Sequence, residues 1–230
     1  MLAWINWEPG GLPRVRRRVE LLNGMPLCRV EIGGRITPLL RLFLRRERRI
    51  LREAGVRQGV WADGLPELLQ LELTAVDVTP LRRAILPALL EQAFRQKRMT
   101  ERTASVRLTA EGTSLPVYWA AQLLAQRVRY LHLETGSGQE GLEDWLLQRY
   151  GLACGGGAPE LEVTLRSAAE PRALLLGENC AVQQVEYILP PALADALPDG
   201  AEGEQLLTAL WRQERLRPRE LAVRRIYFSA

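Results

Sequence analysis

Two stretches within the first hundred residues repeat the same signals at nearly the same spacing. Asn23-Gly24 is followed by Thr37-Pro38, and Asp63-Gly64 is followed by Thr79-Pro80. An Asn-Gly or Asp-Gly pair favours a tight hairpin turn, because both central residues of that turn need a positive φ. A Thr-Pro step favours a helix start, since the threonine oxygen caps free backbone N–H groups and proline fits the first turn. The repeat therefore predicts a duplicated ββα part over residues 1–100.

The first copy has the clearer strand pattern. Apolar residues alternate with charged ones over 15–22 and 26–32, so we expect two strands. The first has Val15, Val19 and Leu21 on one face, and the second has Cys28, Val30 and Ile32 facing inward. A helix then runs to about Ala54, where the following glycine ends it.

The second copy repeats this order. A short strand over 56–61 precedes the turn, and leucines alternate with polar residues over 67–76, which indicates a longer, half-buried strand. The next helix runs to about Gln96, and Pro87 inside it predicts a kink or an early break. We expect the two units to share one sheet with both helices on one face.

The pattern changes near residues 98–103, where we place a boundary between domains 1–100 and 101–230. Strand and helix signals alternate beyond it, which is typical of a parallel sheet. We therefore expect a Rossmann-like parallel sheet in an α/β chain. The expected strands span 104–110, 128–133, 161–165, 173–176, 185–189 and 221–228, and the expected helices begin after Ser114, after Gly138 and at Glu202.

Parts of this second half resemble a group of known sequences. The stretch Ala125-Gln-Arg-Val-Arg-Tyr-Leu-His-Leu-Glu-Thr-Gly136, followed by 142–151, is similar to uncharacterised bacterial proteins with a Rossmann-like C-terminal half. The tail over 206–211 and 223–225 shares this similarity. The resemblance implies a fold, and it brings no assigned activity or site residue.

Composition places broad limits on the chain. Apolar residues make up 47% of its 230 residues, enough for a core, and no apolar run approaches the roughly 20 residues that a membrane helix needs. The start does not resemble a secretory signal, so we expect a cytoplasmic protein without a membrane segment. Three cysteines without close pairs predict no disulfide framework and no zinc site.

Candidate ligand-binding residues lie in the turns after the first two strands of the Rossmann-like part. The free N–H groups of a helix N-terminus bind anions, and glycines let the backbone approach a phosphate. The first turn carries Gly112, although Glu111 would repel a phosphate and the G-x-G-x-x-G pattern is absent. The second turn adds hydroxyls and an acid placed like the ribose-binding acid of dinucleotide sites. Its candidate residues are Glu134, Thr135, Gly136, Ser137 and Gly138.

Catalytic signatures are sparse. His132 is the single histidine, so no multi-histidine metal site exists, and its apolar strand favours a structural role. Neither a G-x-S-x-G elbow nor a P-loop occurs. Cys154, beside residues 155–157, marks either a site of ligand approach or a plain connector. The sequence assigns no cofactor.

Arginines supply nearly all of the positive charge, because Lys97 is the single lysine and the net charge is +4. Their planar guanidinium groups suit carboxylates and phosphates. The leading hypothesis is therefore a binding protein for a small anion or nucleotide. The alternative is a structural or interaction protein that uses an arginine-rich helix face on a partner. Few aromatic residues lie between these arginines, which argues against nucleic acid. The face comprises Arg41, Arg45, Arg48, Arg49 and Arg52.

Overall fold

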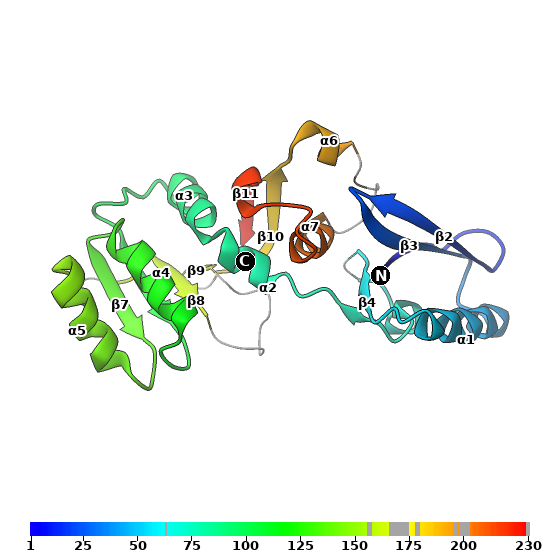
Figure 1. The fold of residues 1–230 in the computed structure, drawn as a ribbon, viewed down its shortest axis with the longest axis horizontal. Coiled ribbons are helices and arrows are strands. Elements are labelled where there is room, and N and C mark those ends of the chain that lie inside the picture. The colour runs from blue at the N-terminus through cyan, green and yellow to red at the C-terminus, as the bar shows by residue number, and fades with distance from the viewer. Residues whose placement is uncertain are drawn as a thin grey trace. The chain divides into compact units, whose positions relative to one another are not determined.

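The computed structural model describes residues 1–62, 64–155, 158–165, 175–177, 180–195, 197 and 203–228. It shows an α/β chain with two compact units, each built on its own sheet (Figure 1). Unit 1 comprises residues 1–78 and 189–220, and unit 2 comprises residues 79–188 and 221–230. The division into domains 1–100 and 101–230 stays a prediction. None of the described helices is both long and apolar enough to cross a membrane.

Unit 1 contains a five-stranded sheet in the order β2-β3-β1-β4-β5. Only the β2–β3 pair is antiparallel, and the other neighbours run parallel. The strands are β1 (Leu2–Glu8), β2 (Arg14–Leu22), β3 (Met25–Gly33), β4 (Gln58–Val60) and β5 (Thr74–Ala75), and the helical segments are α1 (Pro38–Glu53), η1 (Glu67–Gln70), α6 (Pro191–Ala194), α7 (Gly203–Arg212) and η2 (Pro218–Glu220).

The hairpin of the first copy is confirmed. β2 and β3 pair antiparallel up to Leu22 and Met25, and the two turn residues between them both have positive φ. The apolar face expected for β2 is buried only in part: Val15 packs against the core, whereas the Val19 and Leu21 side chains are 63% and 73% exposed. β2 is the edge strand of the sheet, so its side chains have a neighbouring strand on one side only.

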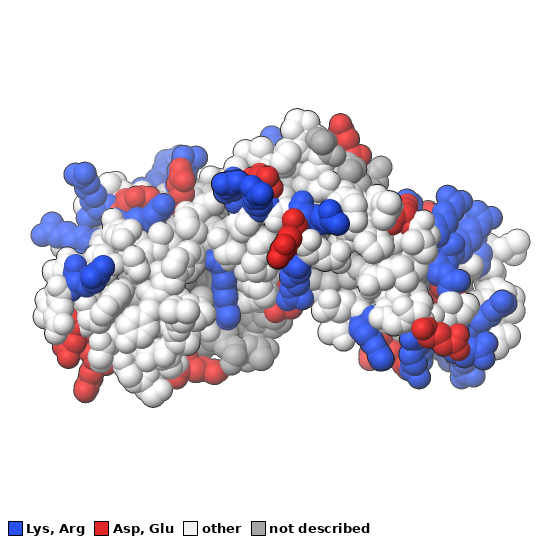
Figure 2. Space-filling view, viewed as in Figure 1, with Lys and Arg blue, Asp and Glu red and all other residues white. Residues whose placement is uncertain are grey.

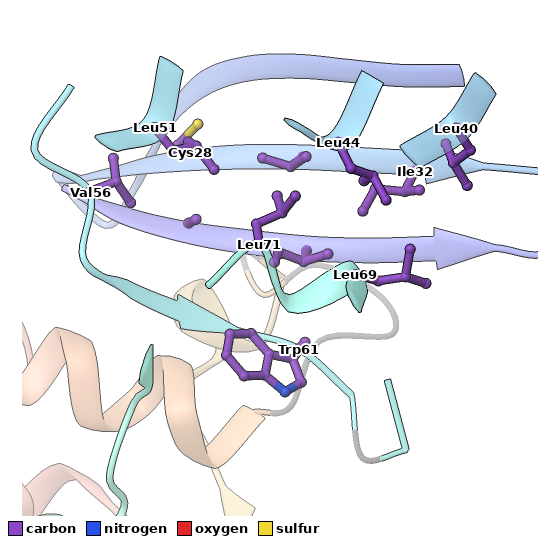
Figure 3. Packing of buried hydrophobic residues seen from close by; sticks show 12 residues of the cluster. Cys28, Ile32, Leu40, Leu44, Leu51, Val56, Trp61, Leu69 and Leu71 are labelled. Carbon is purple, nitrogen blue, oxygen red and sulfur yellow. The ribbon is translucent and has the colours of Figure 1, made fainter. Parts of the chain in front are cut away.

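The helix start of the first copy is also confirmed. The Thr37 hydroxyl accepts a hydrogen bond from the Leu40 N–H at 3.2 Å, which caps α1. Leucines of α1 then pack on the sheet and close the core of unit 1 (Figure 3). The cluster includes Cys28, Ile32, Leu40, Leu44, Leu51, Val56, Trp61, Leu69 and Leu71.

The second copy does not fold as a hairpin. β4 and β5 pair parallel, and the long strand expected over 67–76 is wrong. Residues 67–70 form a 3-10 helix, and Leu71 and Glu72 both adopt a positive φ. Leu69 and Leu71 are nevertheless fully buried. Alternation therefore marked the buried leucines correctly, but the left-handed backbone after η1 buries them without a strand.

Unit 2 contains a six-stranded sheet in the order β11-β10-β9-β8-β6-β7. The expected break at Pro87 is confirmed, because α2 ends before it and α3 begins beside it. The strands are β6 (Ser105–Thr109), β7 (Tyr130–Glu134), β8 (Leu161–Thr164), β9 (Leu175–Gly177), β10 (Cys180–Ile188) and β11 (Ala222–Phe228), and the helices are α2 (Thr79–Ala84), α3 (Leu86–Lys97), α4 (Leu115–Ala125) and α5 (Gln139–Tyr150).

The parallel sheet is confirmed for three strands only. β6 pairs parallel with β7 on one side and with β8 on the other. The pairs β8–β9, β9–β10 and β10–β11 are antiparallel. Two residues separate β9 from β10, and a parallel pair needs a crossover of about a dozen residues or more, so this pair has to be antiparallel.

Candidate functional site

The two turns that carry the predicted site residues lie side by side. β6 and β7 are parallel neighbours, so both turns follow the same edge of the sheet. The Ala110 N–H donates to the Glu134 carbonyl at 2.9 Å, and the Thr113 N–H donates to the Ser137 carbonyl at 3.2 Å. A parallel bridge also joins Gly112 and Ser137. The β6–β7 pairing therefore continues into the turns and holds them together.

Two glycines of the second turn are favoured both by a positive φ and by close packing against the first turn. Gly138 has a φ of +82°, and a Cβ there would lie 2.3 Å from the Thr113 hydroxyl oxygen. Gly136 has a φ of +61°, and its Cβ would lie 2.9 Å from the Glu111 carbonyl oxygen. A Cβ at Gly112 would lie 3.0 Å from the Ser137 hydroxyl oxygen. The glycine content of the two turns thus reflects the contact between them and is not by itself evidence of a ligand.

An open hollow of about 610 Å³ adjoins the turns; we call it the loop hollow. Three of the six predicted site residues line it: Gly112, Ser137 and Gly138. Glu134, Thr135 and Gly136 do not. The remaining lining residues are Arg83, Ala110, Glu111, Thr113, Ser114, Val117 and Leu165.

Arg83 is the cation of the loop hollow, and sequence reasoning missed it. Its Nε–H is buried and has no hydrogen-bond partner within the described part of the chain. No sequence signal marks this residue, because α2 precedes β6 by twenty residues and only the fold brings Arg83 to the turns.

The N-terminus of α4 reaches the same hollow. Ser114 is the N-cap residue by backbone geometry, as the expected helix start implies, but its hydroxyl forms no capping hydrogen bond. Pro116 has no N–H, so the free donors of the first turn are the N–H groups of Leu115 and Val117. Aligned peptide dipoles place partial positive charge at this end. Glu111 also lines the hollow, and its negative charge partly neutralises the positive charge of the helix end.

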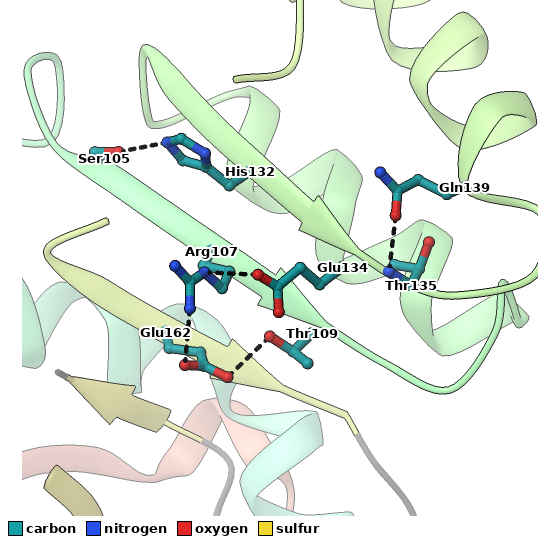
Figure 4. A network of polar contacts seen from close by, with 8 residues as sticks. All are labelled: Ser105, Arg107, Thr109, His132, Glu134, Thr135, Gln139 and Glu162. Atoms are coloured by element: carbon teal, nitrogen blue, oxygen red, sulfur yellow. Dashed lines mark hydrogen bonds and ion pairs between the residues drawn. The ribbon is translucent and has the colours of Figure 1, made fainter. Parts of the chain in front are cut away.

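Glu134 lies on the sheet face rather than in the loop hollow. Its carboxylate forms an ion pair with Arg107 Nε at 3.3 Å (Figure 4). Arg107 also approaches Glu162 at 4.0 Å, and the Thr109 hydroxyl donates to Glu162 at 2.8 Å. The side chains of this network come from β6, β7 and β8, so it ties the parallel strands together. A ribose-binding role for Glu134 stays a prediction.

Thr135 is fully buried beneath the second turn. Its N–H donates to the Gln139 side-chain oxygen at 3.3 Å, and the Gln139 amide donates to Glu143 at 2.8 Å. These bonds connect the end of β7 to the first turns of α5. Thr135 is therefore placed to orient the turn and the helix start.

His132 contacts Ser105, with 3.1 Å between the imidazole Nε2 and the hydroxyl oxygen (Figure 4). Ser105 is 5% exposed and begins β6. The pair therefore lies toward the amino ends of the parallel strands, away from the turns. Ligands of open α/β sheets bind at the carboxyl ends, so the position agrees with a structural histidine.

Cys154 is half-buried in the connection after α5. Gly155 donates its N–H to the Leu131 carbonyl at 2.8 Å, which fixes this connection to β7. Gly156 and Gly157, the rest of the glycine run, lie outside the described residues. Burial, with a smaller contribution from the Glu143 carboxylate, raises the pKa of the Cys154 thiol to about 11.

This raised pKa predicts that the Cys154 thiol reacts slowly with alkylating reagents near neutral pH. At pH 8 about one Cys154 side chain in a thousand would be ionised, whereas an ordinary thiol is about a quarter ionised. We expect alkylation of Cys154 by iodoacetamide, followed by peptide mass spectrometry, to accelerate roughly tenfold per pH unit between pH 8 and 10. A short capped peptide with one cysteine, in the same sample, is the control, and its rate should level off above about pH 9. A plateau for Cys154 at that same pH would contradict the raised pKa.

The arginine-rich face of α1 is partly neutralised. Arg48 and Arg52 both pair with Glu72, and Arg49 lies 3.9 Å from Glu53. In the space-filling view, a few acidic side chains lie among the more numerous basic ones in the region of α1 (Figure 2). The expected face therefore carries less free charge than its sequence implies. Its members Arg41 and Arg45 are exposed and form no ion pair among the described residues.

No cluster of three or more metal-ligating side chains occurs within the described ranges. Comparison with known proteins gives no further assignment. No family model matches the chain, and no curated protein matches its sequence.

Proposed function

We propose that unit 2 is a Rossmann-like domain that binds a small anion, such as a phosphate group, in the loop hollow. The observation that carries the proposal is Arg83, whose buried Nε–H faces no hydrogen-bond partner among the described residues. Guanidinium groups suit phosphates and carboxylates, because their planar donors match two oxygens at once.

The surroundings of Arg83 support this choice. Ser114 and Val117 of the α4 N-terminus line the same hollow, and the Ser114 side chain does not cap the helix. Thr113 and Ser137 also line it, and each carries a hydroxyl that is able to donate a hydrogen bond. The hollow lies at the carboxyl ends of β6 and β7, where ligands of open α/β sheets bind. The proposal concerns binding, and no reaction is assigned to this site.

Removing the guanidinium tests the proposal. Charge-assisted hydrogen bonds contribute about 1.5–3 kcal/mol, so Arg83→Gln is expected to weaken pyrophosphate binding by about tenfold to a hundredfold. Isothermal titration calorimetry of the full chain with millimolar pyrophosphate measures this change.

Arg95→Gln provides the matched control. Arg95 lies on α3 in unit 2, its side chain is 69% exposed, and its ion pair with Glu91 is a surface pair. We expect this variant to bind pyrophosphate like the unsubstituted chain. The proposal fails if the unsubstituted chain shows no binding of phosphate, pyrophosphate or sulfate at millimolar concentration, or if the two variants lose the same affinity.

A further inference from the structure

A second hollow of about 790 Å³ adjoins the loop hollow; we call it the aromatic hollow. It lies between α2, the first turns of α4, and α5. Arg83 lines both hollows. Ser114 lines the loop hollow, and the next residue in the chain, Leu115, lines the aromatic hollow. The volume of each lies within the range of about 300–1,000 Å³ that is usual for ligand pockets. The two hollows therefore form adjoining compartments with an arginine at their junction.

The walls of the aromatic hollow are apolar and rich in rings. Tyr118 and Trp145 contact each other edge to face, with their centroids 5.2 Å apart, so each restrains the other. Trp119 is 41% exposed and takes part in no ring contact among the described aromatic residues. An indole face that has no ring partner is free to stack on a flat group.

We infer that the ligand of unit 2 joins an anionic group to a planar ring, as a 5′-nucleotide does. The phosphate would bind Arg83 in the loop hollow, and the base would lie against Trp119 in the aromatic hollow. Gln122 lines the aromatic hollow and offers both a donor and an acceptor to the edge of a base. This inference rests on the proposed anion site and adds to it the chemical class of the ligand.

Two sources of this chemistry exist, a free mononucleotide and the end of a single-stranded nucleic acid. Both present a phosphate beside a base that can stack on an aromatic side chain. They differ in length, so titrations with AMP and with a 5′-phosphorylated oligoadenylate distinguish them. Tighter binding of the oligonucleotide would identify the strand as the source, and equal or weaker binding would identify the free nucleotide. Either result supports the inference if the substitutions below act as expected.

The decisive comparison uses AMP, ribose 5-phosphate and inorganic phosphate with the full-length chain. We expect AMP to bind about tenfold tighter than ribose 5-phosphate, because stacking of the base adds affinity. Trp119→Leu is expected to remove this advantage and to leave phosphate binding unchanged. Arg83→Gln is expected to weaken all three ligands. Trp211→Leu, on α7 of unit 1, is the matched control and should bind all three like the unsubstituted chain.

The outcomes separate the two proposals. If AMP and ribose 5-phosphate bind equally well, the nucleotide inference is overturned and the anion site stands. If Trp119→Leu binds AMP normally while Arg83→Gln does not, the ring lies elsewhere and the inference is again overturned. If none of the ligands binds, the proposed function itself fails. Circular dichroism of each variant establishes that it is folded, which is expected for Trp119→Leu because this side chain is substantially exposed.

Discussion

Replacing Leu108 by alanine is expected to destabilise unit 2 by about 2–5 kcal/mol, the usual cost of truncating a fully buried leucine. Leu108 lies on β6, the strand between β7 and β8, and its side chain is completely buried. In the ladder it stands beside Leu133 on one side and Val163 on the other. The truncation therefore leaves a cavity in the middle of the parallel strands that hold both turns of the candidate site.

Urea unfolding followed by circular dichroism measures this effect. Leu147→Ala is the matched control, since Leu147 belongs to α5 of the same unit and is 53% exposed. We expect the control to change the free energy of unfolding by less than about 0.5 kcal/mol. Similar losses for the two variants would contradict the placement of Leu108 at the centre of the core.

The alternation of strand and helix signals predicted the parallel part of unit 2 well. Leu131 and Leu133 are separated by one polar residue, and both are buried in β7 as the period of two requires. The order of these strands could not be obtained from periodicity, because pairing depends on contacts far apart in the sequence. The antiparallel strands β9 to β11 show this limit, since their patterns resemble those of the parallel strands.

The second copy of the N-terminal repeat shows why a local pattern can mislead. Its leucines alternate as a strand requires, and Leu69 and Leu71 are indeed buried. They are buried without a strand, because a 3-10 helix over 67–70 is followed by two residues with a positive φ, Leu71 and Glu72. Glu72 also pairs with Arg48 and Arg52 of α1, a tertiary contact that no window of sequence reveals.

The turn residues of the candidate site were predictable from the sequence, but the side chains that the neighbouring helices contribute were not. Gly112, Ser137 and Gly138 line the loop hollow because turns after neighbouring parallel strands meet at one edge, which is a rule of topology. Arg83 comes from a helix before the first of these strands, and Trp119 is one apolar residue among many on α4. Their position beside the turns depends on how α2 and α4 pack, and the sequence pattern contains no measure of that packing.

Replacing Gly138 by alanine is expected to destabilise unit 2 by about 1–3 kcal/mol and to disturb the loop hollow. The φ of +82° at this position is costly for any residue with a Cβ, and the added carbon would lie 2.3 Å from the Thr113 hydroxyl oxygen. To relieve the collision, Thr113 would have to change its side-chain rotamer or the turns would have to separate, and the hydrogen bond from the Thr113 N–H to the Ser137 carbonyl opposes that separation. Urea unfolding gives the loss of stability, and calorimetry gives the accompanying loss of pyrophosphate affinity.

Gly141→Ala makes the prediction specific to this turn. Gly141 lies inside α5, three residues further on, and a Cβ there meets no atom within 4 Å. Alanine favours the helix, so this variant is expected to gain about 0.5–1 kcal/mol. The same substitution should thus have opposite signs at two glycines of one turn and helix. If Gly138→Ala were as stable as Gly141→Ala, that result would contradict the close contact between the two turns and therefore the shape described for the loop hollow.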